Sequence, residues 1–452
     1  MTDPIQRLAE HVMAARWQDL SEGAVNAAKT FVLDSLGVCV SGTAAPFADR
    51  AQAAVARWGG GDEATAIGIG MRLPAPSAAL LNALHMHNQE FDCVHEPAVV
   101  HPMTTILSSS LAVAERRGGI SGRDLILALT LGVDVATTIG MAARSPLKFF
   151  RPATAGVFGV AAAAARIEKL GRGALIDAFG LAYCQAAGSM QAHDEGKPTL
   201  ALQIGMAARA GINAVDLAAA GFPAPHQVLE GPFGYFPLME GDWEIEPAFS
   251  ELGKVWRIAQ ISHKPFPSGR ATHAGIDGIQ RLLRRGDLAA AAVGRVTLIA
   301  PPLIHQLVGR PYRPDMEATY ARLSFPYVGA VTLVKGTVAV DDFAPASLAD
   351  GAIADLAARI EVVVDDNPDQ NALAPQTVRV QLKCGEVREE RVEDMIGSPH
   401  NPLTREQHLA KFRRCWRSGV RPLDPASGER LIGLIDRLDD LSDIGEIIEL
   451  VA

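Results

Sequence analysis

Cysteine is scarce in this sequence. Five cysteines are spread over 452 residues, and no two of them form a CxxC pair. An odd, scattered set argues against a disulfide framework or a zinc ribbon and favours a reducing compartment. We therefore expect a cytoplasmic protein. Aromatic residues are also few, at 6%, whereas alanine and glycine are abundant, which suits helices that pack closely through small side chains.

The sequence also lacks a basic cluster and a long uninterrupted apolar run. The formal net charge is −9, and an acidic chain without a basic patch is poorly suited to binding nucleic acid. The first residues are charged throughout and contain no apolar signal core. Because the most apolar stretch, residues 125–144, is interrupted by Asp134, we expect no membrane span. An anionic small-molecule substrate is compatible with the net charge, since the local charge of a pocket matters more.

Hydrophobic residues make up 48% of the chain, and at this length two or three domains are expected. Apolar residues recur at helical spacing through most of the first half. We predict a mainly α fold whose large all-helical domain comprises residues 1–256 and 396–452. Its predicted helices are residues 5–17, 24–40, 107–117, 122–143, 154–169, 172–191, 200–220, 404–416 and 428–441, with another helix beginning at residue 74.

Residues 257–395 are predicted to form a smaller α+β domain, because short β-branched segments become frequent after Leu252. Residues 377–383 alternate in polarity as a half-buried strand does. The helical tail that follows is expected to pack back on the first domain. The predicted strands are residues 254–260, 293–300, 331–340, 360–365 and 377–383, and the predicted helices between them are residues 272–285 and 347–359.

Titratable residues gather in one window, residues 81–110. Pro97 and Pro102 exclude regular helix from its middle, so we predict a helix, a polar loop and a second helix. Functional residues concentrate in loops held between rigid elements. Four of the twelve histidines lie in this window, namely His85, His87, His95 and His101, together with Glu90, Asp92, Cys93 and Glu96.

These histidines also permit a metal-binding interpretation. His85 and His87 are two residues apart, and side chains at that spacing diverge on a helix. No HExxH or CxxC pattern accompanies them. We therefore predict no metal and no cofactor, and we expect these two histidines to be structural or to lie at the rim of a site.

Seven stretches spread over most of the chain carry a family resemblance. They are VLDSLGVCVSG (32–42), RLPAPSAALLNALHMHNQEFD (72–92), HP (101–102), GPFGYF (231–236), HKPFPSGRATH (263–273), ARLSFPY (321–327) and GSPHNPLT with KF (397–412). In this order they resemble the MmgE/PrpD family, whose members include 2-methylcitrate dehydratase, cis-aconitate decarboxylase and iminodisuccinate epimerase. The resemblance implies an all-helical domain, an α+β domain, a homodimer, no cofactor, and a pocket between the domains.

The resemblance also implies site residues. His101, Lys264 and Tyr327 align with residues credited with catalysis in the decarboxylase and dehydratase branches. Asp92 is retained, whereas Glu90 stands where the family has aspartate. Other positions depart from the family: Cys93, Val94, Leu200 and Gln203 stand where relatives carry an acid, threonine, lysine and histidine. Lys197 replaces the lost lysine only if its loop folds inward, and solvent exposure is the alternative.

Each aligned residue suits proton transfer. The imidazole of His101 titrates near neutrality and is suited to removing a proton beside a carboxylate; the alternative is a loop histidine held by backbone bonds. Lys264 lies in a loop stiffened by prolines, where desolvation would make it an acid or base; the alternative is a solvated lysine. The phenol of Tyr327 can donate to an enolate, or it is simply half-buried.

The remaining site candidates are the two carboxylates and several possible substrate binders. Glu90 and Asp92 would face different ways on a straight helix, so they reach one pocket only if the helix ends there. Arg270 is expected either to clamp a carboxylate or to pair with a nearby acid. The predicted substrate-binding residues are His263, Arg270, His95 and Gln203.

The function predicted from these features is a cofactor-independent enzyme. It would abstract and return a proton α to a carboxylate of a small di- or tricarboxylate. Epimerisation or isomerisation is favoured, because the lost family donors would have served a departing hydroxyl group. The alternatives are a hydro-lyase of the 2-methylcitrate dehydratase type and a non-catalytic binding protein built on the same fold.

Overall fold

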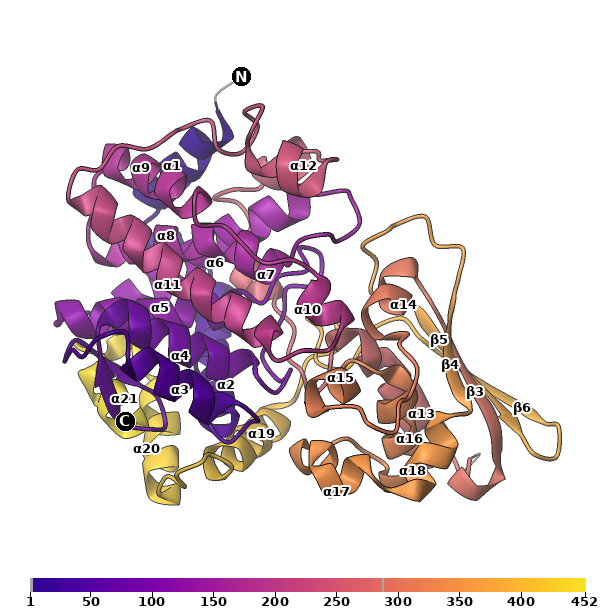
Figure 1. The fold of residues 1–452 in the computed structure, drawn as a ribbon. Coiled ribbons are helices and arrows are strands. Elements are labelled where there is room, and N and C mark those ends of the chain that lie inside the picture. The colour runs from indigo at the N-terminus through magenta and orange to yellow at the C-terminus, as the bar shows by residue number, and fades with distance from the viewer. Residues whose placement is uncertain (1–2, 287) are drawn as a thin grey trace.

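Two hydrophobic cores organise the chain. The computed structural model describes residues 3–286 and 288–452. Helices from both ends of the chain share the larger core, and the smaller core is formed mainly by residues 266–395. Figure 1 shows the last helices lying beside the first ones, with the α+β part to one side. The predicted fold class, mainly α with a smaller α+β domain, is confirmed.

Side-chain caps and prolines start several helices of the larger core. Ser21 and Ser121 each accept a hydrogen bond from a backbone N–H in the following first turn, and Pro102 occupies the first turn of its helix. The helices are α1 (Pro4–Ala14), α2 (Glu22–Gly42), α3 (Ala48–Ala56), α4 (Ala75–His87), α5 (Pro102–Arg117), α6 (Gly122–Ala142), α7 (Arg151–Thr154), α8 (Gly156–Ile167), α9 (Arg172–Tyr183), α10 (Gln191–Asp194), α11 (Thr199–Ala219), α12 (Glu246–Phe249), α19 (Arg405–Arg417), α20 (Pro425–Asp436) and α21 (Gly445–Val451).

The C-terminal tail packs back on the first domain, as predicted. Helix α19 lies against α2, and α20 also contacts α2. A capping box at Thr404 and Gln407 begins α19. Strands β1 (Ala64–Ala66) and β2 (Met71–Leu73) form a small antiparallel pair between α3 and α4.

By length and composition alone, helices α2 and α6 are long and apolar enough to cross a membrane. Their most apolar windows are 72% and 94% buried inside this fold, respectively. They therefore serve as core helices here. Alanine and glycine allow them close neighbours: a Cβ on Gly132 of α6 would lie 2.7 Å from the carbonyl oxygen of Gly159 in α8.

The smaller domain is a four-stranded sheet with helices packed against it. The strand order is β4-β3-β5-β6, with β3 and β4 parallel and the other pairs antiparallel. Helices α13 and α16 pack against the sheet. The elements are α13 (His273–Arg284), β3 (Val293–Ala300), α14 (Pro302–Val308), α15 (Ala318–Arg322), α16 (Phe325–Lys335), α17 (Pro345–Leu348), α18 (Gly351–Ala357), β4 (Ile360–Val364), β5 (Gln376–Leu382) and β6 (Val387–Val392).

Two predicted strands are wrong. Residues 331–335 form the end of α16, and residues 336–339 form an irregular turn. Helix α16 starts after the cap Ser324 and packs on α13 and α18, so tertiary contacts override β propensity. Residues 254–260 form a turn and a 3₁₀ helix (Arg257–Gln260), because the Arg257 N–H donates to the buried carboxylate of Asp134. Strand β6 was not predicted, since its charged edge-strand sequence lacks a hydrophobic pattern.

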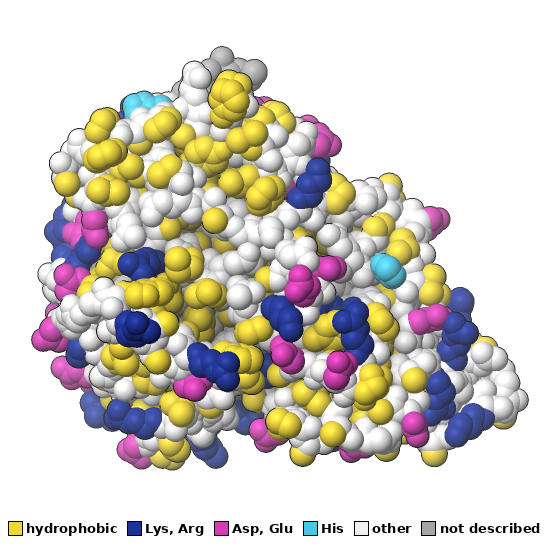
Figure 2. Space-filling view, viewed as in Figure 1, with side chains coloured by type: hydrophobic (Ala, Val, Ile, Leu, Met, Phe, Trp, Pro, Cys, Tyr) yellow, Lys and Arg dark blue, Asp and Glu magenta, His cyan; other side chains and the backbone are white. Residues whose placement is uncertain are grey.

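Exposed large hydrophobic side chains are unevenly distributed. Figure 2 shows hydrophobic side chains gathered over the upper part of the helical domain, while charged side chains are frequent along the lower edge of that domain and on the α+β domain. The most exposed apolar side chains of the helical domain are Phe233, Val420, Leu238 and Phe222.

Candidate active site

The end of helix α4 brings two carboxylates to one place. The helix stops at His87, and Glu90 adopts a left-handed conformation with φ of +52°, which is uncommon for a residue other than glycine. The reversal places both acids around one imidazole: His87 Nε2 lies 3.2 Å from Glu90 Oε1, and His87 Nδ1 lies 3.0 Å from Asp92 Oδ2. Helix α4 therefore ends before Glu90, which is the condition under which the two acids were expected to reach one pocket.

His87 is positively charged in this setting. Burial by itself would lower the pKa of His87, but Asp92 and Glu90 outweigh burial and raise the pKa to about 9. The sequence had suggested a structural or rim position for this histidine. The structure instead places it at the centre of the cluster, because the turn after α4 folds both acids back over the ring.

Lys264 supplies the second cation. It is fully buried in the loop before α13, and its Nζ lies 2.7 Å from Glu90 Oε2 and 3.8 Å from Asp92 Oδ1. Nζ also donates to the Glu90 carbonyl oxygen at 3.3 Å. Burial would raise the pKa values of Glu90 and Asp92, but the surrounding cations hold them well below their usual range. Both acids are therefore carboxylates.

His101 lies between this cluster and a pocket that is described below. It is the N-cap residue of α5, and its Nδ1 lies 3.0 Å from Asp92 Oδ2 and 3.1 Å from the Cys93 carbonyl oxygen. Thr104 donates to the same Asp92 oxygen at 2.6 Å. With Nδ1–H directed at Asp92, the lone pair lies on Nε2. Burial lowers the pKa of His101 despite Asp92, so the ring is a neutral base at neutral pH.

A pocket between the two domains adjoins His101 and Glu90. Asp92 and Lys264 lie behind this wall, as they do not line the pocket. The helical domain and the linking loops contribute Glu90, Val94, Val99, His101, Leu147, Phe150, Pro152, Met190 and His193, and the α+β domain contributes Gly269, Arg270, Ala271, Leu307, Val308, Leu323 and Leu373. One polar corner in an apolar chamber is typical of small-molecule sites.

Two arginines add positive charge near this pocket. Arg310 donates to His193 at 3.0 Å, while its Nη1 is buried without a partner among the described residues. Arg322 is also buried, and its Nε has no partner there. Burial lowers the pKa of Arg322 to about 10, although Glu90 opposes the shift. Sequence reasoning missed both arginines and His193, although Arg322 lies within the ARLSFPY stretch.

Several predicted site residues make structural contacts instead of lining the pocket. Tyr327 donates its hydroxyl to the backbone oxygen of Asp342. His95 accepts from the Ala98 N–H at 3.2 Å, and Gln203 accepts from the Ser189 N–H at 2.8 Å. The pocket lining includes none of these three side chains. Each is held by a backbone group of a nearby turn, which sequence spacing alone does not reveal.

His263, Arg270 and Lys197 also differ from their predicted roles. His263 packs on Phe31, with ring centroids 4.6 Å apart, and it is not one of the residues that line the pocket. Arg270 lines the pocket, but its guanidinium is engaged by Glu96 at 2.8 Å and by two backbone oxygens. Lys197 is half exposed and lies 3.6 Å from Glu317, so it does not replace the lysine lost at Leu200.

Two buried groups have the composition of a metal site. In each, the ligand atoms lie within 4.8 Å of one another: His87, Asp92 and His101, and Asp34, His263 and His408. A protein cation already meets the carboxylate in both groups. His87 is itself charged in the first, and Lys411 Nζ lies 2.8 Å from Asp34 Oδ1 in the second. The residues therefore do not fit a divalent cation well, and the absence of a metal stays a prediction.

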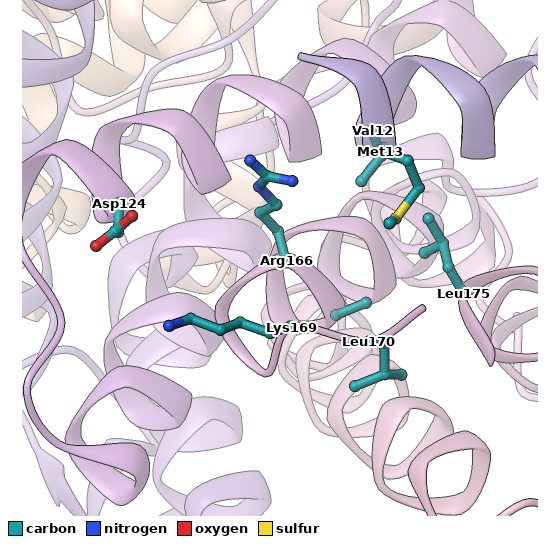
Figure 3. Close-up of a pocket in the computed structure, with 8 residues that line it drawn as sticks. Val12, Met13, Asp124, Arg166, Lys169, Leu170 and Leu175 are labelled. Carbon is teal, nitrogen blue, oxygen red and sulfur yellow. The ribbon is translucent and has the colours of Figure 1, made fainter. Parts of the chain in front are cut away.

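A further pocket lies among α1, α6, α8 and α9 and shares no residue with the site. Figure 3 shows the charged side chains of Asp124, Arg166 and Lys169 at one side and Val12, Met13, Leu170 and Leu175 at the other. Arg166 already donates to the Ala15 carbonyl oxygen. No group of candidate catalytic residues converges there among the described residues.

The fold and site define a class of two-domain protein with a buried acid–base cluster at an interdomain pocket. The MmgE/PrpD N-terminal domain model matches residues 6–248, and the MmgE/PrpD C-terminal domain model matches residues 266–432. The chain therefore belongs to the MmgE/PrpD family, and the resemblance read from the sequence is confirmed.

Curated relatives align over nearly the whole chain. Cis-aconitate decarboxylase of Mus musculus is 28% identical over 450 residues, covering 96% of this chain and 90% of the relative. The Homo sapiens enzyme is 28% identical, with 96% and 91% covered. The Aspergillus terreus enzyme is 27% identical, with 96% and 92% covered.

Proposed function

We propose that this protein is an enzyme that transfers a proton at the carbon next to a carboxylate of a small di- or tricarboxylate. The observation that carries the proposal is the Asp92–His101 pair at the wall of a pocket that also has under-partnered arginines nearby. Asp92 orients His101 through Nδ1 and leaves Nε2 free to act on a ligand. An oriented imidazole is an effective general base.

The charges of the site favour an anionic substrate. The carboxylates of Glu90 and Asp92 are balanced by the cations of His87 and Lys264. Arg310 and Arg322 then leave an excess of positive charge near the pocket. A guanidinium in a dry pocket can hold a substrate carboxylate and stabilise the enolate that forms when the α-proton leaves.

The proton-transfer steps can be assigned to named groups. Nε2 of His101 takes the α-proton, the C–H electron pair moves into the enolate, and Asp92 stabilises the imidazolium. Return of the proton to the same face gives exchange. Return to the other face gives epimerisation, in which the Lys264 ammonium gives a proton to the Glu90 carboxylate that it contacts, and Glu90 at the pocket wall passes that proton to the carbon. Proton abstraction and return is the first candidate reaction, since His101 is neutral.

Decarboxylation is the second candidate, favoured by the near full-length similarity to cis-aconitate decarboxylases. In that reaction the bond to the carboxylate carbon breaks and CO₂ leaves. The electron pair stays on the substrate carbon. Because His101 is neutral at rest, its Nε2 must first take a proton from solvent, and it then passes that proton to the carbon. An apolar chamber suits this step because it disfavours the ground-state carboxylate.

The test is an NMR assay in D₂O with cis-aconitate, citrate, 2-methylcitrate and a set of chiral dicarboxylates. Deuterium that enters the α-carbon without release of CO₂ or loss of water supports an isomerase or epimerase. CO₂ release supports the decarboxylase candidate, and loss of water supports a hydro-lyase. Saturable binding of a carboxylate without exchange, CO₂ release or dehydration would overturn the proposal and favour a non-catalytic binding protein.

A further inference from the structure

A second buried cluster lies behind the catalytic turn, and we call it the rear cluster: Asp34, His263, His408 and Lys411. It joins two sequence stretches that the proposed reaction does not use, because Asp34 lies in α2 and Lys411 in α19. Lys411 is 2% exposed and Asp34 is 1% exposed. Helices from the two ends of the chain therefore meet through a buried ion pair.

Lys411 uses its ammonium on two partners. Nζ lies 2.8 and 3.0 Å from the two carboxylate oxygens of Asp34, and it donates to the Phe91 carbonyl oxygen at 2.9 Å. Nζ also lies 4.2 Å from the centroid of the Phe91 ring. Phe91 is the residue between Glu90 and Asp92. The hydrogen bond from Lys411 to the Phe91 carbonyl oxygen therefore fixes the turn that carries both carboxylates.

Contacts on two sides of the turn also hold Phe91 in place. Its ring packs with Val38 of α2 and Cys415 of α19 in a small separate core. On the pocket side, Lys264 donates to the preceding carbonyl oxygen, that of Glu90. Two ammonium groups thus hold two successive carbonyl groups of a turn whose first residue has a positive φ. Such a conformation persists only where its surroundings determine it.

We propose that Lys411, anchored by Asp34, is a positioning residue that fixes the Glu90–Phe91–Asp92 turn and thereby orients Asp92 toward His101. This inference rests on the proposed function. The C-terminal helix α19 completes the site in this way without contributing a residue to the pocket wall. A displacement of about 1 Å at a catalytic pair is enough to reduce the rate by about 100-fold.

The test separates positioning from folding. Lys411→Met alone leaves the Asp34 carboxylate buried and unpaired, so it destabilises the protein. The double variant Asp34→Leu/Lys411→Met removes both charges, and apolar replacement of a buried pair is often neutral for stability. We expect its melting temperature to stay within about 4 °C of the wild type. Its kcat should fall about 10- to 100-fold while KM changes less than about threefold.

Two further variants keep the test decisive. Asp34→Asn retains Lys411 but weakens its anchor, and it should give a smaller fall in kcat with KM unchanged. Leu431→Ala is the matched control, because it removes a fully buried side chain from α20 in the same C-terminal tail. It should lower the melting temperature without changing kcat at a permissive temperature.

Amide hydrogen exchange supplies a readout that needs no substrate. We expect peptides covering residues 89–94 to exchange at least about tenfold faster in the double variant than in the wild type. If the wild type acts on none of the carboxylates, the proposed function fails, and the exchange result still decides the role of Lys411. Wild-type kcat and unchanged exchange at residues 89–94 in both the double variant and Asp34→Asn would overturn the inference.

Discussion

The two buried clusters on either side of Phe91 have nearly the same composition but different surroundings. The pocket cluster (His87, Glu90, Asp92, His101 and Lys264) and the rear cluster each combine histidines, a lysine and carboxylate. In the pocket cluster, Glu90 and His101 line a cavity. In the rear cluster no residue lines that cavity, and the ammonium group of Lys411 binds the Asp34 carboxylate and the Phe91 carbonyl oxygen. Residue types alone therefore do not distinguish a catalytic cluster from a structural one, because the difference lies in whether a ligand can reach the side chains.

His87 of the pocket cluster and His263 of the rear cluster have opposite charge states. His87 lies between two carboxylates and is held as a cation. Burial lowers the pKa of His263 to about 3, although Asp34 opposes the shift, so His263 is neutral. The difference follows from the number of acids: one carboxylate in the rear cluster is already neutralised by Lys411, whereas the pocket cluster has two carboxylates and one lysine.

Replacement of His101 should have the largest effect on activity. His101→Ala is expected to lower kcat by about two to four decades, the range for a positioned general acid or base. The matched variant His408→Ala, in the rear cluster, should lower kcat by less than about tenfold. Steady-state kinetics with the best substrate from the NMR assay measures both. Equal losses would show that access to the cavity does not separate the clusters.

Replacement of Lys264 should have the largest effect on stability. Lys264→Met leaves the two buried carboxylates of Glu90 and Asp92 with one cation between them, His87, and such an uncompensated buried charge costs about 3–5 kcal/mol. Glu90→Gln/Lys264→Met should recover most of that stability but not the activity. Urea denaturation measures the free energy of unfolding. A double variant as unstable as the single one would mean that Lys264 stabilises the fold through contacts other than Glu90.

The contributions of His87 and His263 to the pH dependence of stability should have opposite signs. The pKa of His87 in the fold, about 9, lies above its usual 6.5, so its contribution is complete below pH 6.5 and is lost as pH rises toward 9. The pKa of His263 lies below 6.5, so its contribution is present above pH 6.5 and is lost as pH falls toward 3.

Variants in each cluster test these signs. His87→Gln should flatten the alkaline decline in unfolding free energy and leave the acid side in place, and His263→Gln should flatten part of the acid decline. Denaturation measured between pH 3 and pH 10 covers both windows. An alkaline decline that persists in His87→Gln would contradict the assignment of His87 as a cation.

Replacement of the Tyr327 hydroxyl should have a small effect. Because that hydroxyl donates to the Asp342 backbone oxygen, Tyr327→Phe is expected to cost about 1 kcal/mol of stability. The kcat should change by less than about threefold, well short of the 100-fold expected for an acid catalyst. A loss of two decades in kcat would instead restore Tyr327 to the catalytic role implied by the family resemblance.

Chelation should have the smallest effect. A cationic His87 and Lys411 already meet the carboxylates of the two candidate ligand groups, so activity after dialysis against EDTA should match that of untreated protein. Activity that is lost on chelation and restored by a single divalent metal would reassign His87, Asp92 and His101 as ligands.

The sequence by itself determined the fold class, the family and the position of the key turn. Helical periodicity and the prolines around His101 are local signals, and local signals persist in the fold. The sequence also indicated that Glu90 and Asp92 can reach one pocket only if the helix before them ends there. Pro97 and Pro102 exclude regular helix shortly after these residues, so a helix end nearby was expected. His101 and Lys264 were identified through the family motifs rather than through spacing alone.

Tertiary structure alone decided which charged groups meet. His87, Arg310, Arg322 and Lys411 each acquire their partners from segments distant in sequence or from a reversed turn, and no periodic pattern records such contacts. The same applies to Tyr327 and His263, which packing places outside the pocket lining. Charge state depends on burial and on neighbours within a few ångströms, and these are properties of the folded chain rather than of its residue order.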